Sequence, residues 1–395
     1  MSDVGIDIIL LADRLAGGDE VRTTRALVER LDRLGHTSRV ICRSAAVDHG
    51  IGDLAECPGL GGRWQLPWAS RGLRLGDRPG RPRVLHVLSA SMADAGLEVA
   101  ERWQLPYLLS VDEFPRRSGR LRLSRSWCRG LVATNRELAD ALIREFQVPA
   151  RAIRTIARGI PAPVASPPAG KGRVPVVGAA GPMVAGSGFA TFLNAARKVV
   201  DAGIDAEFLI AGQGDDEADL RRRADRLRIA DRLTIADEYT VGRTFWDALD
   251  VFCQTSVIPT AGRPLSLAMS HGVPSIAAEV EGLRTIIRDG EDGLRVPRGD
   301  AGALAGAVLA MLSDPARAAR LGEAGRDAVL RDHHPDLEAG RLDELYRGIV
   351  AGGLGPQDFG LTSRADTPGD GVGPQGTRSG PAAGLDAFPR LSPGA

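Results

Sequence analysis

Short apolar runs alternate with longer amphipathic stretches over the first 160 residues of the chain. Compact apolar runs are typical of buried strands, whereas the wider apolar spacing between them is typical of helices. In this half we expect strands at 4–12, in "LGHTSRVICR" and at 83–89, 106–111, 130–134 and 152–157. We expect helices from Gly17-Gly18 to about Leu34, at 91–103 and at 135–146. Strands that alternate with helices predict a parallel sheet with helical crossovers.

A proline- and glycine-rich segment, "PAPVASPPAGKG" at 161–172, interrupts this pattern, which then starts again. The second half has expected strands in "VPVVGAAG", "AEFLIAG", "RLTIAD", "DVFCQTS" and "VPSIAAE", with helices near 188–202, 216–228, 243–250 and 263–271. The chain is therefore predicted to be an α/β protein with two Rossmann-like, doubly wound domains that face a cleft. Their expected limits are 1–160 and 174–335, with a linker at 161–173, a closing helix at 336–351 and a disordered tail at 352–395.

The composition narrows the classes of partner. Lys plus Arg and Asp plus Glu number 50 each, so no net charge favours nucleic acid, and no nucleic-acid partner is expected. The first apolar run is too short to cross a bilayer. The cysteines show no metal-ligand spacing and suit the reduced thiols of a cytoplasmic protein: Cys42, Cys57, Cys128 and Cys253.

Two glycine-containing turns lie where a strand is expected to lead into a helix. Gly17-Gly18 follows the first strand, and Gly212 begins "GQGDD" in the second half. Backbone N–H groups at such a helix start can approach a phosphate. A plain turn explains the first turn equally well, and favourable pairing of acidic residues with the helix dipole explains the second.

A third stretch, "PTAGRPLSLAMSHGVPS" at 259–275, predicts a helix that begins after a Gly-Arg-Pro turn. Proline fits the first helical turn because it needs no N–H partner there. Arg263 lies at the expected start of the helix, so a phosphate could meet both the guanidinium and the helix terminus.

In motif order and spacing, the whole chain resembles the retaining GT-B glycosyltransferases of the family-4 type. The resemblance is strongest over 174–350, through "VVGAAGPMVAGSGFATFLNAARKV", "FLIAGQGDD", "LAMSHGVPSIA", "EGLRTIIRDGEDGLRVP" and "LDELYRGIV". It extends to 4–160, where "AGGDEVRTTRALVERLDRLGHTSRV" is similar to the first strand–helix unit of the family. The resemblance implies a nucleoside-diphosphate sugar as substrate and no metal or other cofactor.

The chain departs from the family at positions that carry charge. The resemblance places the family's arginine and lysine for the diphosphate at Pro182 and Ser187, and its two glutamates at Pro259 and Leu267. It places the histidine of the first domain at Asp112, and the family's Asn-Gly pair appears as Arg158-Gly159. Proline and leucine side chains accept no hydrogen bonds. Losing one stabiliser of transition-state charge costs about 3 kcal/mol, or a few hundredfold in rate. The loss of these charged side chains also leads us to expect weaker binding of nucleotide sugar than in intact members of the family.

The candidate site therefore combines what the resemblance implies with the groups that remain able to bind a phosphate. Asp112 is the candidate catalytic residue, expected near the reacting sugar. Arg263 and the start of the 263–271 helix are expected to stabilise the leaving diphosphate, aided by Arg158. The full set of candidate donor-binding residues is Gly17, Gly18, Arg158, Ser187, Gly212, Gly262, Arg263 and Ser266.

The resemblance implies transfer of a hexose to a glycan, lipid or small-molecule acceptor, in the synthesis of cell-surface polysaccharide or glycoconjugate. The charge losses leave open a catalytically silent relative that acts as a binding or scaffold partner of an active glycosyltransferase. A GT-B sugar-nucleotide epimerase is a third reading, for which the sequence has no dedicated motif.

Two arginine-rich segments, 63–83 and 116–129, hold six arginines each and interleave them with Trp or Leu. That pattern suits an anionic membrane surface, so weak membrane contact at the inner face is expected of a cytoplasmic protein. Exposed, arginine-biased loops are the alternative reading. His86 is expected to be a satisfied core residue, and His333-His334 to precede the last helix.

Overall fold

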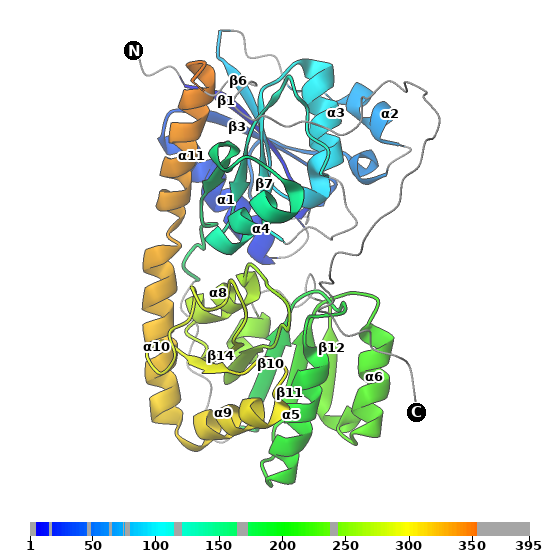
Figure 1. Ribbon diagram of the computed structural model, residues 1–395, viewed down its shortest axis with the longest axis vertical. Coiled ribbons are helices and arrows are strands. Elements are labelled where there is room, and N and C mark those ends of the chain that lie inside the picture. Colours follow the sequence, from blue (N-terminus) through cyan, green and yellow to red (C-terminus); the bar gives the residue numbers. More distant parts are fainter. Residues whose placement is uncertain are drawn as a thin grey trace, which may run out of the picture. The chain divides into compact units, whose positions relative to one another are not determined.

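The computed structural model describes residues 5–15, 18–45, 49–62, 65–73, 75, 80–113, 121–163, 173–237 and 244–353. Two parallel sheets organise this part of the chain, one in each half (Figure 1). Each sheet is covered by helices on both faces, which confirms the predicted Rossmann-like α/β architecture. Gly17, Trp64, Asp77, most of the expected linker and residues 354–395 of the expected tail lie outside the described residues.

The N-terminal sheet has seven strands in the order β5-β3-β1-β6-β7-β8-β9, and all neighbours are parallel. The strands are β1 (Asp7–Leu11), β3 (Thr37–Cys42), β5 (Leu54–Glu56), β6 (Arg83–Val87), β7 (Tyr107–Val111), β8 (Cys128–Ala133) and β9 (Ile153–Thr155). The helices of this half are α1 (Gly18–Arg33), α2 (Leu66–Gly72), α3 (Ala93–Trp103) and α4 (Arg136–Phe146). A two-stranded pair, β2 (Arg14–Leu15) and β4 (Ser44–Ala45), lies beyond β1 and β3.

Alternating side chains of each strand face opposite layers of the N-terminal domain. Ile9 and Leu11 of β1 pack with α3 and α4, whereas Ile8 and Leu10 pack with α1 and the last helix. Both faces of the strand are therefore buried, as expected of a parallel sheet between two helical layers.

The C-terminal sheet has six parallel strands in the order β12-β11-β10-β13-β14-β15. They are β10 (Val176–Ala180), β11 (Glu207–Ala211), β12 (Leu233–Ala236), β13 (Val251–Gln254), β14 (Ser275–Ala278) and β15 (Leu294–Val296). The helices are α5 (Phe189–Asp201), α6 (Glu217–Arg226), α8 (Arg263–Ser270), α9 (Ala301–Ser313) and α10 (Pro315–Asp332), with a further helical turn at 244–248.

The last helix, α11 (Pro335–Val350), belongs to the core of the N-terminal domain (Figure 1). Its apolar residues Leu342, Tyr346 and Ile349 pack against β1 and α1. The side chain of His334 accepts a hydrogen bond from the N–H of Asp336 and so caps the helix, as the expected position of His333-His334 requires. The chain therefore returns to its first domain after completing the second.

A buried polar network fixes α11 to the N-terminal sheet. His86 of β6 contacts the Tyr346 hydroxyl through Nδ1 at 2.6 Å and the Ser110 hydroxyl through Nε2 at 2.8 Å. His36 accepts the N–H of Ile6 through Nδ1, so its Nε2 carries the proton and donates to Asp343 at 2.6 Å. The expectation that His86 is a satisfied core residue is correct.

Burial, reinforced by the positive charge of Arg158, lowers the pKa of His86 from 6.5 to about 3. Between these values the unfolded chain binds one more proton at this position than the folded chain. The free energy of unfolding should therefore fall as pH falls, by up to about 1.4 kcal/mol per pH unit from this residue. In urea titrations between pH 7 and pH 4.5, His86→Gln should reduce that slope, and equal slopes would contradict this assignment.

Candidate functional site

Polar side chains gather beyond the carboxyl ends of the N-terminal strands, where α/β sheets bind their ligands. Asp13 follows β1, Ser89 and Ser91 follow β6, and Asp112 follows β7. The Ser89 hydroxyl donates to Asp112 Oδ1 at 3.1 Å, and the Ser91 hydroxyl donates to Asp13 Oδ2 at 2.8 Å. Arg43, after β3, also donates to Asp13, at 2.9 Å. This end of the domain can therefore hold a ligand rich in hydroxyl groups.

Five charged residues from both domains interact at the boundary between the domains, and we call them the boundary cluster. They come from the start of α1, the ends of β7 and β9, the start of α8 and the first turn of α11: Glu20, Asp112, Arg158, Arg263 and Glu338. Three carboxylates thus share two guanidinium groups.

Glu20 is the member that contacts both arginines. Arg263 Nε lies 3.0 Å from Glu20 Oε1, and Arg158 Nη2 lies 3.8 Å from Oε2. Arg263 also donates to the Thr23 hydroxyl at 3.2 Å, one turn further along α1. Arg158 donates to the carbonyl of Leu88 at 3.2 Å. Arginines from two different domains therefore converge on one carboxylate.

The three carboxyl groups differ in how readily they ionise. Burial favours the neutral form of Glu20, but the charges of Arg263 and Arg158 outweigh it and lower its pKa. Burial raises the pKa of Asp112 and of Glu338 despite the nearby Arg158. Glu338 also accepts the N–H of Gly159 at 2.9 Å. Glu20 is therefore the one carboxyl group of the three whose pKa the arginines lower.

Three further contacts join the first domain to the start of the linker and to the second domain. The indole Nε1 of Trp246 donates to Asp19 Oδ2 at 2.7 Å. Arg22 donates to the carbonyl of Pro161 at 3.3 Å, and Ile160 donates its N–H to the carbonyl of His333 at 2.8 Å. The start of α1 therefore contacts the second domain at more than one point.

Close backbone approaches shape the loop between β10 and α5, where the resemblance places the family's cations. Gly188 has φ +81°, and a Cβ there would lie 1.7 Å from the carbonyl oxygen of Thr255. A Cβ on Gly212 would lie 2.0 Å from the carbonyl oxygen of Gly181. The Ser187 hydroxyl donates to the carbonyl of Val184 at 2.8 Å, within its own loop. Pro182 is exposed.

Helix α8 begins as the sequence predicts. Gly262 has φ +69° at the N-cap, and Pro264 occupies the first helical turn. Ser266 and Leu267 are buried, and Leu267 packs into the domain core with Trp246. The start of α8 therefore offers the Arg263 guanidinium at the positive end of a helix, whereas Leu267 faces the core.

The structure brings some predicted site residues together and leaves others apart. Arg158 and Arg263 both contact Glu20. Asp112 lies close enough for the charges of Arg158 and Glu20 to affect its pKa. Gly18 begins α1, and Gly262 caps the helix that starts with Arg263. The Ser187 hydroxyl forms its hydrogen bond within its own loop, and Ser266 is buried. Gly212 allows a close approach to the backbone of Gly181. Gly17 lies outside the described residues.

Four residues that contact the predicted ones were not themselves predicted: Glu20, Thr23, Ser89 and Glu338. Glu20 had a recognisable pattern, because "GGDE" places carboxylates in the first turn of a helix after a candidate phosphate turn. The other three are ordinary helix and loop residues whose partners lie far away along the chain.

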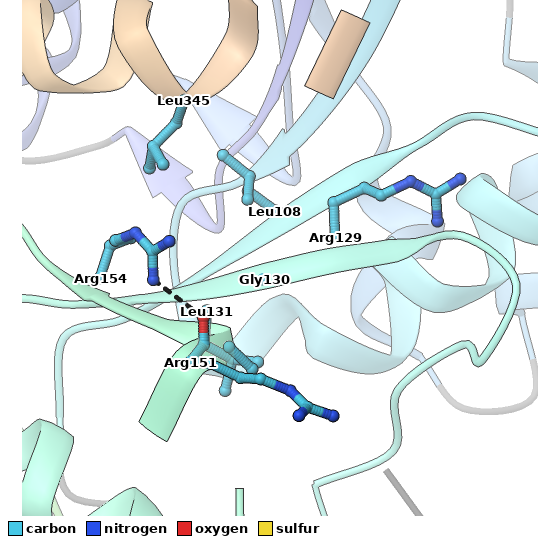
Figure 2. Close-up of a pocket in the computed structure, with 8 residues that line it drawn as sticks. Leu108, Arg129, Gly130, Leu131, Arg151, Arg154 and Leu345 are labelled. Carbon is cyan, nitrogen blue, oxygen red and sulfur yellow. Dashed lines mark hydrogen bonds between the residues drawn. The ribbon is translucent and has the colours of Figure 1, made fainter. Parts of the chain in front are cut away.

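A pocket lies at the opposite, amino end of the N-terminal strands (Figure 2). Its lining includes Arg129, Arg151 and Arg154 together with Leu108, Leu131 and Leu345. Arg154 donates to the carbonyl of Arg151 at 2.8 Å, and in Figure 2 the Arg129 and Arg151 side chains both extend toward the right of the view with their guanidinium groups well apart. The arginines therefore form a splayed basic rim and do not converge on one point.

Among the described residues, no group of three His, Cys, Asp or Glu side chains could hold a metal ion. Within the same ranges, no helix combines the length and the apolar character needed to cross a membrane.

The two halves of the chain match two family descriptions. Residues 20–162 match "Glycosyltransferase Family 4", and residues 174–314 match "Glycosyl transferases group 1". Among solved structures, Alr3699/HepE from Anabaena, in complex with UDP and glucose, aligns with TM-score 0.68 and 15% identity, over 86% of this chain and 99% of that one. Sucrose-phosphate synthase from Thermosynechococcus elongatus aligns with TM-score 0.66 and 20% identity, over 88% and 100%.

These similarities define the architecture as GT-B. The chain has a glycosyltransferase family 4 domain followed by a group 1 glycosyltransferase domain, and its fold is that of the GT-B glycosyltransferases.

Curated relatives are similar over shorter stretches. A phosphatidyl-myo-inositol mannosyltransferase of Mycobacterium leprae is 30% identical over 167 residues, which is 42% of this chain and 44% of the relative. The lipopolysaccharide core biosynthesis glycosyltransferase LpsE of Rhizobium meliloti is 29% identical over 156 residues, 40% of this chain and 45% of the relative. The chain thus spans less than half the length of these relatives.

Because Gly188 lies against the carbonyl of Thr255, Gly188→Ala should destabilise the protein more than the same substitution at Gly203, which serves as the control. Gly203→Ala places a Cβ in open space at φ +83°, so it should cost only the left-handed backbone penalty of about 1–2 kcal/mol. Gly188→Ala has the same penalty and also meets a carbonyl oxygen, so its free energy of unfolding should fall further. Urea unfolding of both variants checks this, and equal losses would show that the loop between β10 and α5 moves freely.

Proposed function

We propose that this protein is a retaining glycosyltransferase that transfers a hexose from a nucleoside-diphosphate sugar. The acceptor would be a glycan, a lipid or a small molecule. The observation that carries the proposal is the convergence of Arg158 and Arg263, from two domains, on one compact anion at the start of α8. A site able to hold the Glu20 carboxylate in this way can hold a phosphate group.

The diphosphate would lie against the first turn of α8, where the helix dipole and the Arg263 guanidinium both favour negative charge. Arg158 would add a second positive charge from the first domain. Asp112 would lie near the reacting sugar, on the side of the site where Ser89 already bonds to it. No metal is needed in this arrangement, because the two guanidinium groups supply the charge that offsets the leaving diphosphate.

The acceptor class is supported by the relatives and by the N-terminal domain. By their names, one relative transfers mannose to phosphatidyl-myo-inositol and the other acts in lipopolysaccharide core biosynthesis, so both act on glycolipids, which carry many hydroxyl groups. The carboxylates of Asp13 and Asp112, with the hydroxyls of Ser89 and Ser91, suit such an acceptor. We therefore propose a role in the synthesis of cell-surface polysaccharide or glycoconjugate.

Removing Arg263 should weaken nucleotide binding more than removing an arginine elsewhere. Hydrogen bonds to charged groups contribute about 1.5–3 kcal/mol, so Arg263→Ala should lower the affinity for UDP, GDP or ADP sugars about 10- to 100-fold. Arg221→Ala is the matched control, because Arg221 is exposed on α6 and pairs only with Glu217 of its own helix among the described residues. Calorimetric titration of the three proteins measures the difference.

Tight binding that Arg263→Ala leaves unchanged would contradict this placement of the diphosphate. Release of sugar from the donor, followed in the same samples, separates the enzyme from a catalytically silent relative. An enzyme should lose turnover but keep affinity in Asp112→Asn, whereas a silent binding partner should bind the donor and release no sugar in any variant.

We also propose weak contact with an anionic membrane through 63–83 and 116–129. Of their described residues, Trp68 is 71% exposed with the Arg71 guanidinium 5.0 Å from its ring centroid. Arg122 lies 3.8 Å from Asp94 of α3. One arginine of these segments is therefore paired with a carboxylate that lies outside them. An exposed Trp beside arginine is suited to the interface of a bilayer.

Each arginine near an anionic bilayer contributes about 1 kcal/mol to binding, and salt screens it with a Debye length of about 8 Å at physiological ionic strength. The protein should therefore sediment with vesicles containing anionic lipid at low salt and dissociate as salt rises. Trp68→Ala together with Arg71→Ala should reduce the bound fraction. Equal sedimentation with neutral and anionic vesicles, or none with either, would identify these segments as ordinary solvated loops.

A further inference from the structure

The arginine best placed to receive a diphosphate is already engaged by the opposite domain. Both Arg263 contacts to α1 come from one face of that helix: Glu20 at 3.0 Å and the Thr23 hydroxyl at 3.2 Å. Residues three apart lie side by side on a helix, so together they engage two nitrogens of the guanidinium. Only 26% of the Arg263 side chain is exposed.

The other arginine of the site is engaged in a similar way. Arg158 is 15% exposed, donates to the carbonyl of Leu88 and lies 3.8 Å from the second oxygen of Glu20. Glu20 therefore lies between the two positive charges, with one carboxylate oxygen toward each. Its side chain keeps 36% of its surface exposed, so it can move into solvent.

A carboxylate and a phosphate bind the same hydrogen-bond donors. Both are compact anions that accept hydrogen bonds from guanidinium nitrogens, so they cannot occupy the same N–H groups at once. If both remained in place, the negative charges would also repel each other across a short distance.

We propose that Glu20 is an internal competitor of the nucleoside diphosphate for Arg263. In the ligand-free protein its carboxylate holds Arg263 and joins α1 to α8, and a bound diphosphate displaces it. This inference rests on the proposed function, because it assigns the diphosphate to Arg263. Glu20 is thus a positioning residue that sets the affinity for the nucleotide without itself contacting it.

The substitution Glu20→Gln removes the negative charge of the side chain but keeps its size and shape. Glutamine keeps a carbonyl oxygen for Arg263 but lacks the negative charge, so it competes less strongly with a diphosphate. The matched control is Glu29→Gln on the same helix, because Glu29 is 53% exposed and pairs with Arg25 at 3.7 Å, far along α1 from Arg263.

Calorimetric titration of the full chain with UDP, GDP, ADP and inorganic pyrophosphate tests the proposal. Glu20→Gln should bind the best of these about 10- to 100-fold more tightly than wild type, and Glu29→Gln should match wild type. The gain should disappear in the double variant with Arg263→Ala, since the competition acts through that arginine. Equal or weaker binding by Glu20→Gln would overturn the proposal.

A second readout does not depend on nucleotide. Phenylglyoxal modifies accessible guanidinium groups, and peptide mass spectrometry can follow its reaction with Arg263. The rate at Arg263 should rise severalfold in Glu20→Gln and remain unchanged in Glu29→Gln. If no protein binds any nucleotide but Arg263 becomes reactive in Glu20→Gln, the proposed function fails while the hold by Glu20 stands. An unchanged rate at Arg263 means that Glu20 does not hold it, and the competition is refuted.

Discussion

The carboxylate of Glu20 between Arg158 and Arg263 is the interaction on which the functional arrangement depends. Taking guanidinium groups out of water is costly unless anions accompany them. Burial raises the pKa of Asp112 and Glu338, whereas the charges of the two arginines lower the pKa of Glu20, which contacts both of them. One side chain thereby links the start of α1, the end of β9 and the start of α8, which are the three points where a sugar nucleotide would meet both domains.

The return of the chain to its first domain supports this arrangement. Helix α11 supplies Glu338 to the boundary cluster and, further along, Tyr346 to the buried network around His86. The N–H of Gly159 donates to Glu338, directly beside Arg158, so the position of that arginine depends on the docking of α11. Core packing and site geometry are therefore coupled through one helix.

Most of the fold could be predicted from the sequence because its strands are apolar runs separated by helical spacing. The proline-rich segment at 161–172 predicts a division between two halves, and each half has one parallel sheet of its own. The edge strands β5 and β15 were not predicted; each has only three residues, one of which is charged. The docking of α11 on the N-terminal domain was also not predictable, because its partners lie about three hundred residues earlier in the chain, as the pair of His36 and Asp343 illustrates.

The candidate site was only partly predictable, for a physical reason. Arg158, Arg263 and Asp112 could be singled out because they replace or flank positions at which the resemblance implies chemistry. Glu20 could not be assigned a role, because its effect arises from a pairing across some 240 residues that sequence spacing does not encode. The burial of Leu267 likewise depends on which face of α8 meets the sheet.

The central claim is that Arg263 exchanges Glu20 for the diphosphate of the donor. The most direct test is a crystal structure of the protein with a nucleoside diphosphate, in which the distance from Arg263 to Glu20 is compared with its present 3.0 Å. The account predicts a phosphate oxygen within hydrogen-bond distance of the Arg263 guanidinium and Glu20 separated from it by more than a salt-bridge length. A nucleotide bound elsewhere, with Glu20 and Arg263 still paired, would contradict it.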